Sequence, residues 1–483
     1  MTTSSPNEVV VRHDYPDGLR LDVNLGKGVA AYPIFMMEKP GRMLAKYLET
    51  LIGKPSVERA ALRFNEPPRV IILCDENTAE LFGIDVETQF ISAGWRVDAL
   101  TVPAGEAAKS LAVVEQLCEA LGTLGATRDT VLCSLGGGVV SDLTGFVAGI
   151  YKRGMHLVHI STTLLGLVDA AVGGKTAVNL PTGKNQIGLY KHPLVIATDL
   201  AYLQDLPEAD YQCGLAEAAK TALLAGEDFT AWMEINAEGL RRRDPVTLKE
   251  LIAACITFKA QVVAADPTED MVPSTRLSLN YGHTLGHVIE TITAQRHEEQ
   301  LQQAQYVEES ASTATPIVPI DAVPHGIAVA QGMRFEARIA MQLVDAPADF
   351  VLRQDALLDA LGLPALDPSI MGSNRDAMLE VFYRDKKTQD SDLRFILLPA
   401  PGQPEIVTVS REVLCDHLRA WLAVPKRSEA QAAELAESDQ ASTSPDTEST
   451  PVTPDSTPVT PAPEPGSLHP EESTASAPKE PTT

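Results

Sequence analysis

Cysteine is sparse and scattered in this sequence, and long apolar runs are missing. Six cysteines occur among 483 residues, and none forms a CxxC pair. A disulfide framework and a thiolate zinc site are therefore not expected, and a reducing cytoplasm fits the composition. No apolar run approaches the roughly 18 residues of a membrane span. The first residues also lack the basic and apolar regions of a secretory signal, so we expect neither membrane insertion nor secretion.

Positive charge is also in short supply. The sequence holds 39 Lys and Arg against 65 Asp and Glu, a formal net charge of −26. This balance, with no basic stripe, argues against nucleic-acid binding. Much of the negative charge lies in 425–483, where Pro, Ser, Thr, Glu and Ala cannot bury enough apolar surface to offset chain entropy. We predict that this acidic tail is disordered.

What is present is an alternation of strand-like and helical segments. Residues 1–18 are polar and aperiodic, and we interpret them as a flexible N-terminal arm. From 19 to 206, buried strands such as 69–74 and 129–135 alternate with helical periodicity. This pattern is typical of a doubly wound parallel sheet, so it predicts an α/β domain of Rossmann type.

Helical periodicity dominates after a hinge at Leu206–Pro207. We therefore predict a mostly α-helical second domain at 207–424, with a short strand pair at 393–398 and 405–408. Within it, 297–323 passes from Glu, Gln and Ala into Ser, Thr and Pro. We interpret this stretch as a flexible surface insertion.

Histidines indicate a metal site in the helical half. His283 and His287 are four residues apart and would lie on one face of a helix. A further histidine, His325, follows in a Pro-His-Gly motif, and Glu217 lies in the helical run 214–220. Two imidazoles and a carboxylate would form an open zinc-type site, although a lone histidine pair at this spacing is more often structural.

A triple glycine, Gly136–Gly138, follows a predicted strand and opens a helix. Glycines at that position let backbone N–H groups approach a pyrophosphate. The GxGxxG pattern is not satisfied, because Ser141 stands where its third glycine would be, so a plain tight turn remains open. Asp75 at a strand's carboxyl end and Glu106 in a loop are candidates for nucleotide recognition. For Glu106 the alternative is a solvated helix start.

Cationic residues predict a pocket for a small polyanion. The segment 169–176 looks like the phosphate-binding loop of P-loop NTPases, but Asp169 occupies a required glycine position. We therefore reject a P-loop NTPase. Two loops still present Lys175 and Lys184, which by themselves would usually face solvent. Together with further basic residues, these lysines could bind a small ligand with several negative charges, such as a phosphorylated acid. The further basic residues are Arg153, Lys220, Lys259, Arg276 and the lysines of 385–387.

Eight motifs in order resemble the 3-dehydroquinate synthase family of the sugar-phosphate cyclase superfamily. The resemblance covers roughly 60–400. The motifs are Gly136–Leu143, Thr162–Leu165, Val168–Thr176, Gly183–Asn185, Gly214–Lys220, Leu279–His287, His325–Gly326 and Arg384–Lys387.

The resemblance implies a carbon–oxygen lyase of the shikimate pathway, in aromatic amino-acid biosynthesis. Its members close 3-deoxy-D-arabino-heptulosonate 7-phosphate into 3-dehydroquinate with catalytic NAD and one divalent metal, zinc or cobalt. NAD oxidises a ring alcohol held by the metal, phosphate is eliminated, the hydride returns, and an intramolecular aldol closes the ring. Net redox is zero. A cytoplasmic homodimer without nucleic-acid or membrane partners is also implied.

The resemblance further implies roles for individual residues. Glu217, His283 and His325 become the metal ligands, and His287 becomes an active-site histidine near the substrate phosphate. Arg153 is a candidate contributed across a dimer. The implied substrate contacts are Lys175, Lys184, Asn185, Lys220, Lys259, Arg276, Asn280 and Lys386. The implied NAD-binding residues are Asp75, Glu106, Lys109, Gly137, Gly138, Asp142, Thr162, Thr163, Asp169, Lys175, Lys184, Tyr202 and Asp205.

Some features depart from the family pattern. Ile327 stands where many members carry a glutamate, so a carboxylate beside the metal ligands is missing or replaced. Ser161 replaces a usual proline before Thr162. The insertion lengthens the span before His325 and leaves His297 as a rival third ligand.

Three alternatives remain beside the leading interpretation. A sister cyclase would act on sedoheptulose 7-phosphate or glucose 6-phosphate, although Asn280 and Asp169–Lys175 keep the dehydroquinate-type pattern. A metal-dependent polyol dehydrogenase would accumulate NADH. A degenerate scaffold would bind partners through its acidic tail and catalyse nothing.

Overall fold

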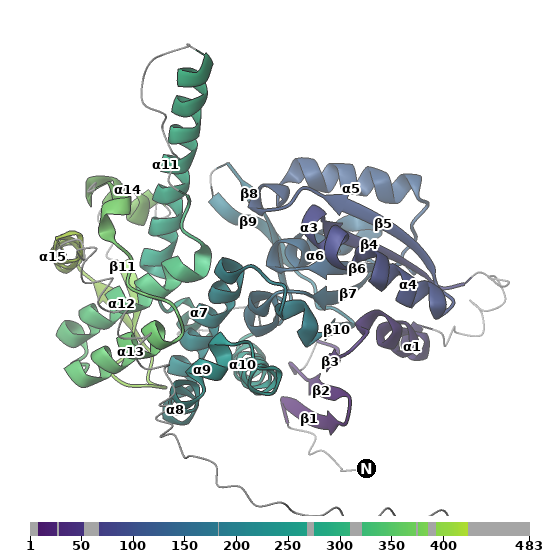
Figure 1. The fold of residues 1–483 in the computed structure, drawn as a ribbon, viewed down its shortest axis with the longest axis horizontal. Coiled ribbons are helices and arrows are strands. Elements are labelled where there is room, and N and C mark those ends of the chain that lie inside the picture. Colours follow the sequence, from purple (N-terminus) through teal and green to yellow (C-terminus); the bar gives the residue numbers. More distant parts are fainter. Residues whose placement is uncertain are drawn as a thin grey trace, which may run out of the picture. The chain divides into compact units, whose positions relative to one another are not determined.

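In the computed structural model, the described residues form one compact unit (Figure 1). No helix in the described part of the chain is long and apolar enough to cross a membrane. All six cysteines are free thiols in this structure. The residues that the structure describes are 8–26, 29–52, 67–181, 183–267, 275–309, 321–372, 375–384 and 393–423.

An eight-stranded sheet organises the first half of the chain, in the order β1-β2-β3-β10-β7-β6-β4-β5. Six of its strands run parallel. They are β3 (Tyr32–Met37), β4 (Arg69–Asp75), β5 (Arg96–Val102), β6 (Val131–Gly136), β7 (His156–Ser161) and β10 (Val195–Thr198). The prediction of a doubly wound parallel sheet is therefore confirmed.

Helices cover both faces of this sheet, which explains why β6 is buried at every position. On one face, α5 (Leu111–Thr123) and α6 (Gly138–Ile150) contribute to a core with Leu132 and Leu157 of the sheet. On the other face, α1 (Pro40–Ile52) and α4 (Ile84–Ser92) pack against Val131 and Val158. Figure 1 shows these helices as two layers around the strands.

The strand order reverses at β4. The chain runs from β4 outward to β5, then returns to place β6 on the other side of β4. In open α/β sheets, ligands bind at the carboxyl ends of strands where the order reverses, because the two connections diverge there. The Gly136–Gly138 turn, which follows β6, and Asp75, at the end of β4, both lie at this point.

The expected N-terminal arm is partly wrong. β1 (Val10–Tyr15) and β2 (Gly18–Val23) form an antiparallel hairpin that extends the sheet beside β3. β2 alternates buried and half-buried side chains, as a strand with one covered face does, whereas β1 is half-exposed at an edge and carries no apolar alternation. Residues 1–7 lie outside the described residues.

The second half is mostly helical, as expected. It begins with α7 (Glu208–Ala225), after η5 (Leu200–Leu203), and continues with helices that pack in two hydrophobic clusters. They are α8 (Glu227–Ile235), α9 (Ala237–Arg241), α10 (Pro245–Ala265), η6 (Thr275–Asn280), α11 (His283–Glu309), α12 (His325–Leu343), α13 (Ala348–Ala360), η7 (Pro368–Met371), α14 (Arg375–Arg384) and α15 (Arg411–Leu422).

The predicted strand pair is confirmed as β11 (Leu393–Leu397) and β12 (Glu405–Val409). The predicted insertion is wrong in its first part, because α11 continues to Glu309. Glu and Gln at 298–303 are good helix formers, so the polar composition there reflects a largely exposed helix rather than a loop. Residues 310–320 and the tail at 425–483 lie outside the described residues. The division at 206 remains our proposal for the domain boundary.

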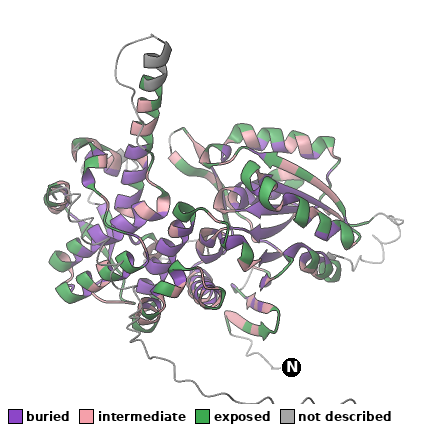
Figure 2. Ribbon diagram, in the orientation of Figure 1, coloured by how far each residue is buried: buried purple, intermediate pink, exposed green. Residues whose placement is uncertain are grey.

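α7 runs through the centre of the helical half and is buried on nearly every side (Figure 2). Small residues allow neighbouring segments to approach it closely. A side chain at Gly214 would meet Leu164 Cβ at 2.5 Å, and one at Gly326 of α12 would meet Cys213 Cα at 2.3 Å. α7 therefore lies between the sheet half and α12, which places its polar residues at the junction of the two halves.

Candidate active site

Three residues from three helices converge at this junction. Glu217 lies on α7, His283 is the first residue of α11 and His325 is the first residue of α12. The Nε2 atoms of both histidines lie 3.5 Å from Glu217 Oε1. One potential ligand atom from each residue lies within 4.8 Å of the others. The structure thus brings together the three predicted ligands.

Hydrogen bonds orient the two imidazoles toward this centre. His283 Nδ1 lies 3.1 Å from the Tyr281 carbonyl oxygen, and His325 Nδ1 lies 3.3 Å from Glu290 Oε2. With Nδ1 donating in each ring, both Nε2 lone pairs face Glu217, which is the tautomer that a metal ligand requires. Among the described residues, Glu217 Oε1 is buried and receives no hydrogen bond. Such an orphaned oxygen between two imidazoles fits a divalent cation.

The electrostatics of the triad reflect buried opposite charges. Burial would raise the pKa of the Glu217 carboxyl, but Lys220, His283 and His325 outweigh it and hold this pKa well below its usual value. Burial, with Lys220 adding to it, lowers the pKa of His283 to about 3. Burial also opposes the charge on His325, but interactions with Glu217 and Glu290 raise its pKa to about 10. A bound cation would displace the proton from His325.

Buried cations adjoin the triad on the side of the sheet. Lys220, one turn after Glu217 on α7, forms an ion pair with Glu217 Oε2. Lys259 of α10 donates to Asp169 Oδ1 at 2.7 Å. Arg276 is 3% exposed and donates to the Pro267 carbonyl oxygen at 2.8 Å. Two lysines and one arginine in a buried region can hold an anion with several charges.

A second polar network lies near the start of α6. Lys109 is 5% exposed and donates to Asp142 Oδ2 at 2.8 Å and to Asn185 Oδ1 at 2.7 Å. Glu106 accepts from Asn179 Nδ2 at 2.8 Å. Gly137, the residue before α6, supplies no side-chain cap. The helix N-terminus is therefore left for an external acceptor, as a diphosphate-binding turn requires.

Comparisons with known proteins agree with this arrangement. A family model described as 3-dehydroquinate synthase N-terminal matches residues 99–213, and one described as 3-dehydroquinate synthase C-terminal matches 214–388. The chain belongs to the 3-dehydroquinate synthase family. A 3-dehydroquinate synthase of Xylella fastidiosa is 36% identical over 71% of this chain and 89% of its own length. The 3-dehydroquinate synthase of Dehalococcoides mccartyi is 33% identical over 70% of this chain and 85% of its own length.

Two solved structures share the fold. A 2-deoxy-scyllo-inosose synthase complexed with carbaglucose-6-phosphate, NAD+ and Co2+ has a TM-score of 0.62 at 24% identity, covering 81% of this chain and 98% of its own. A 2-epi-5-epi-valiolone synthase of Streptomyces hygroscopicus with NAD+ and Zn2+ bound has a TM-score of 0.60 at 22% identity. The match covers 83% of this chain and 98% of the synthase. At these identities the likeness concerns the fold alone.

Within the 3-dehydroquinate synthase fold, other predicted residues lie close to the triad. His287 stands one turn after His283, with ring centroids 5.4 Å apart. Lys184 of the β8–β9 hairpin (Lys175–Leu180 and Gly183–Tyr190) donates to Glu290 Oε1 at 2.9 Å. Asn280 is exposed at the end of η6, and Lys175 is exposed at the start of β8. The roles of these residues remain predictions.

Some residues predicted to line the NAD site also have structural roles. Asp75 caps the short helix after β4 by accepting from Thr78 N at 2.8 Å. Tyr202 packs against Phe82 with ring centroids 4.4 Å apart, and burial raises the pKa of its hydroxyl. Thr163 Oγ1 accepts from Gly166 N at 3.0 Å. Nucleotide contacts by these residues remain predictions.

In the described part of the chain, the remaining predicted site residues show no contact that supports or contradicts their proposed roles. Thr162 is buried, and its backbone N–H donates to the Gly136 carbonyl oxygen at 3.1 Å. Asp205 is exposed after η5. Arg153 is exposed in η3 (Tyr151–Arg153) with φ of +63°. Lys386 lies outside the described residues.

The rival ligand His297 is too distant to join the triad. It follows His283 by fourteen positions on the same helix, which corresponds to roughly 20 Å along α11 at 1.5 Å per residue. His325, whose ring centroid is 5.4 Å from that of His283, is the third member instead.

Sequence reasoning missed Glu290. It lies on α11 at positions i+7 from His283 and i+3 from His287, so the helical spacing of the two histidines already placed it on the same face. Its contact with His325 brings a carboxylate from α11 next to a predicted ligand, while Ile327 packs against the core.

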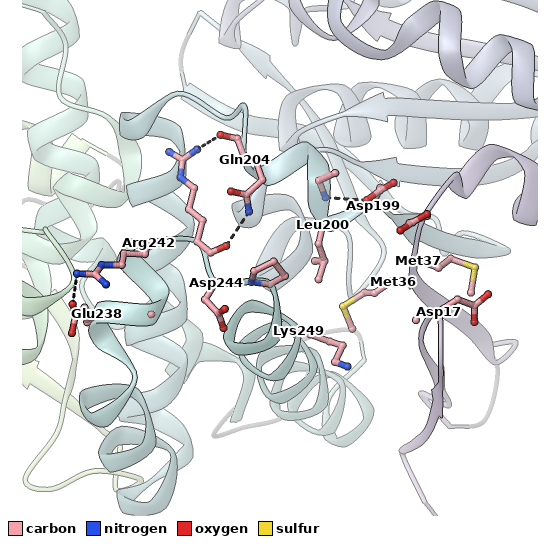
Figure 3. Close-up of a pocket in the computed structure, with 16 residues that line it drawn as sticks. Asp17, Met36, Met37, Asp199, Leu200, Gln204, Glu238, Arg242, Asp244 and Lys249 are labelled. Carbon is pink, nitrogen blue, oxygen red and sulfur yellow. Dashed lines mark hydrogen bonds and ion pairs between the residues drawn. The ribbon is translucent and has the colours of Figure 1, made fainter. Parts of the chain in front are cut away.

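A pocket of about 890 Å³ elsewhere contains none of the predicted residues. It lies where the N-terminal hairpin and β3 approach the start of α10 (Figure 3). Charged groups in it pair with one another, as Arg242 does with Glu238 at 2.6 Å. It is therefore distinct from the candidate active site.

Proposed function

We propose that the chain is a 3-dehydroquinate synthase that converts 3-deoxy-D-arabino-heptulosonate 7-phosphate to 3-dehydroquinate and phosphate. One observation carries the proposal. Glu217 Oε1 is buried without a hydrogen bond from the described residues and faces Nε2 of His283 and His325, beside the buried ammonium of Lys220. A metal centre next to buried cations suits a substrate that carries a hydroxyl to be activated and two anionic groups.

Glu217, His283 and His325 would hold one divalent cation, zinc or cobalt. The donor set of one carboxylate and two imidazoles is typical of catalytic zinc sites with open positions. Bound there, the cation would lower the pKa of a substrate hydroxyl and polarise the ketone formed from it. The protein's part is to direct both Nε2 atoms at Glu217, with Nδ1 of each ring held on its outer side.

NAD would lie at the point where the strand order reverses. Gly137 and Gly138 leave the start of α6 uncapped, and this helix N-terminus would receive the diphosphate. Lys109, which is buried, and the half-buried Asp142 already form a pair beside it. We propose that Asp75 and Glu106 contact the ribose hydroxyls, because both side chains extend from the same edge of the sheet.

The buried cations would bind and orient the substrate. Lys220, Lys259 and Arg276 would hold its carboxylate and phosphate, and the exposed Lys175, Lys184 and Asn280 would complete the pocket. Fixing the substrate in a low-dielectric site keeps its C–H bond aligned for phosphate elimination and excludes water. We further propose a cytoplasmic homodimer in which Arg153 reaches the partner's site.

A coupled assay tests the proposal. Purified protein is incubated with the heptulosonate phosphate, NAD and zinc, while phosphate release and dehydroquinate formation are followed. We expect both products in equal amounts and no net NADH. Turnover of sedoheptulose 7-phosphate or glucose 6-phosphate instead would reassign the substrate. NADH accumulating with a polyol would indicate a dehydrogenase.

A further inference from the structure

The two histidines of the triad share an unusual position, since each is the first residue of a long helix. A helix N-terminus carries a partial positive charge of about half a unit. A cation held by both residues would therefore meet two positive helix ends. Glu217 offsets part of this repulsion, and both helix ends must be held in place for the two histidines to bind one cation.

Glu290 of α11 lies beside the start of α12. Its side chain is 10% exposed, and Oε2 lies 3.3 Å from His325 Nδ1. The other oxygen, Oε1, accepts from Lys184 at 2.9 Å. A carboxylate that accepts from the outer nitrogen of a ligating imidazole fixes the ring and makes its inner nitrogen a better donor to the metal.

Glu336 of α12 lies beside the start of α11. It is fully buried, and Oε2 accepts from the Gly282 backbone N–H at 2.7 Å. Gly282 precedes His283 with φ of +80°, a conformation that favours glycine. A side chain at Gly332 of α12 would meet the Gly282 carbonyl oxygen at 1.8 Å. The turn that presents His283 is therefore pressed onto α12 and held there by Glu336.

We propose that Glu290 and Glu336 are reciprocal positioning residues, each extending from the helix that bears one histidine ligand to hold the histidine at the start of the other helix. The inference rests on the metal binding that the proposed function requires. It adds that the distance between His283 and His325 is set by the α11–α12 pair rather than by either helix alone. Neither glutamate touches the substrate in this scheme.

Zinc binding to the metal-free protein tests this inference without any assay of turnover. Glu290→Met and Glu336→Met keep the side-chain volume but remove the acceptor. We expect each to weaken zinc binding by about 10- to 100-fold in competition with a chelator, the usual effect of losing an outer partner of a ligand. Glu290→Gln and Glu336→Gln should recover part of the loss, because the amide oxygen still accepts a hydrogen bond.

Two controls separate positioning from general damage. Lys184→Met removes the other partner of Glu290, and we expect zinc affinity within about threefold of the wild type. Gln354→Leu removes the buried hydrogen bond with the Tyr281 hydroxyl, next to the same turn. We expect it to lower the melting temperature of the metal-free protein by a few degrees, without weakening zinc binding.

The outcomes are distinguishable. If the wild type binds zinc and the Met variants bind it equally well, the inference is wrong while the proposed function stands. If the Gln variants recover nothing, hydrogen bonding by these carboxylates does not position the ligands. If the wild type binds no zinc, both the inference and the proposed metal site are overturned.

Discussion

Lys259 donates a hydrogen bond at 2.7 Å to Asp169 Oδ1 across 90 positions of sequence. Asp169 lies in η4 (Gly166–Ala170), just after the central strands, whereas Lys259 lies on α10 of the helical half. Burial raises the pKa of Asp169, but Lys259 and Lys220 outweigh it and leave the pKa below its usual value. This pair joins the two halves where the nucleotide and the metal are proposed to meet.

Replacing Lys259 with Met should weaken substrate binding. A hydrogen bond to a charged group contributes about 1.5–3 kcal/mol, so KM should rise at least about tenfold. Lys249→Met on the same helix is the matched control, because that lysine lines the separate pocket of Figure 3 and should leave KM unchanged. Steady-state kinetics on both variants measure the effect. Equal KM values would remove Lys259 from the substrate site.

The sequence was informative where local patterns encode structure. Buried strands such as 69–74 are continuous apolar runs, because a parallel sheet covered on both faces needs them. The i, i+4 spacing of His283 and His287 identified a helix face directly. Glu217 and His325 came from the family resemblance together with their motifs, since no local spacing relates a residue of α7 to one of α12.

The structure was needed where partners are distant and composition misleads. Glu336 meets Gly282 across 54 positions, and nothing in the sequence around either residue indicates that contact. The sequence of β1 does not indicate a strand, because an edge strand with one poorly covered face lacks apolar alternation. The first part of the expected insertion is helical because polar helix formers and loop residues overlap in composition.

Replacing Glu217 with Gln should abolish metal binding and lower the free energy of unfolding. Glu217 and Lys220 are 1% and 3% exposed in their side chains, so the variant leaves a buried ammonium without its counter-charge. Breaking such a pair costs about 3–5 kcal/mol. Urea unfolding of the metal-free protein measures this loss, and elemental analysis measures metal content. His283→Ala should lose the metal with a smaller loss of stability; full metal content in either variant would contradict the ligand assignment.

Glu336 should make stability fall as pH rises. Burial raises the pKa of its carboxyl from 4.5 to about 8 in the folded protein. Between these values the folded state holds a proton that the unfolded state has released. Its stabilising contribution is therefore complete below about pH 4.5 and is lost as pH rises through about 8, with a slope of up to about 1.4 kcal/mol per pH unit.

The comparison with Glu336→Gln isolates this effect, because glutamine does not titrate. Urea unfolding of both metal-free proteins between pH 6 and 9 should show the wild type losing stability relative to the variant as pH rises. A difference that is independent of pH would show that Glu336 does not change its protonation in this range.

Replacing Gly137 with Ala should weaken NAD binding. The added Cβ would meet Thr163 Cγ2 at 2.8 Å and Thr163 Oγ1 at 3.1 Å, so either Thr163 turns or the start of α6 shifts. Both changes disturb the uncapped backbone N–H groups proposed to receive the diphosphate, and we expect NAD affinity to fall about tenfold, or about 1.4 kcal/mol. Gly83→Ala is the matched control, because its Cβ would lie 4.0 Å from Ala79 Cβ, an ordinary contact. Calorimetric titration measures the Kd for NAD of each variant and of the wild type. An unchanged Kd in Gly137→Ala would place the dinucleotide away from this turn.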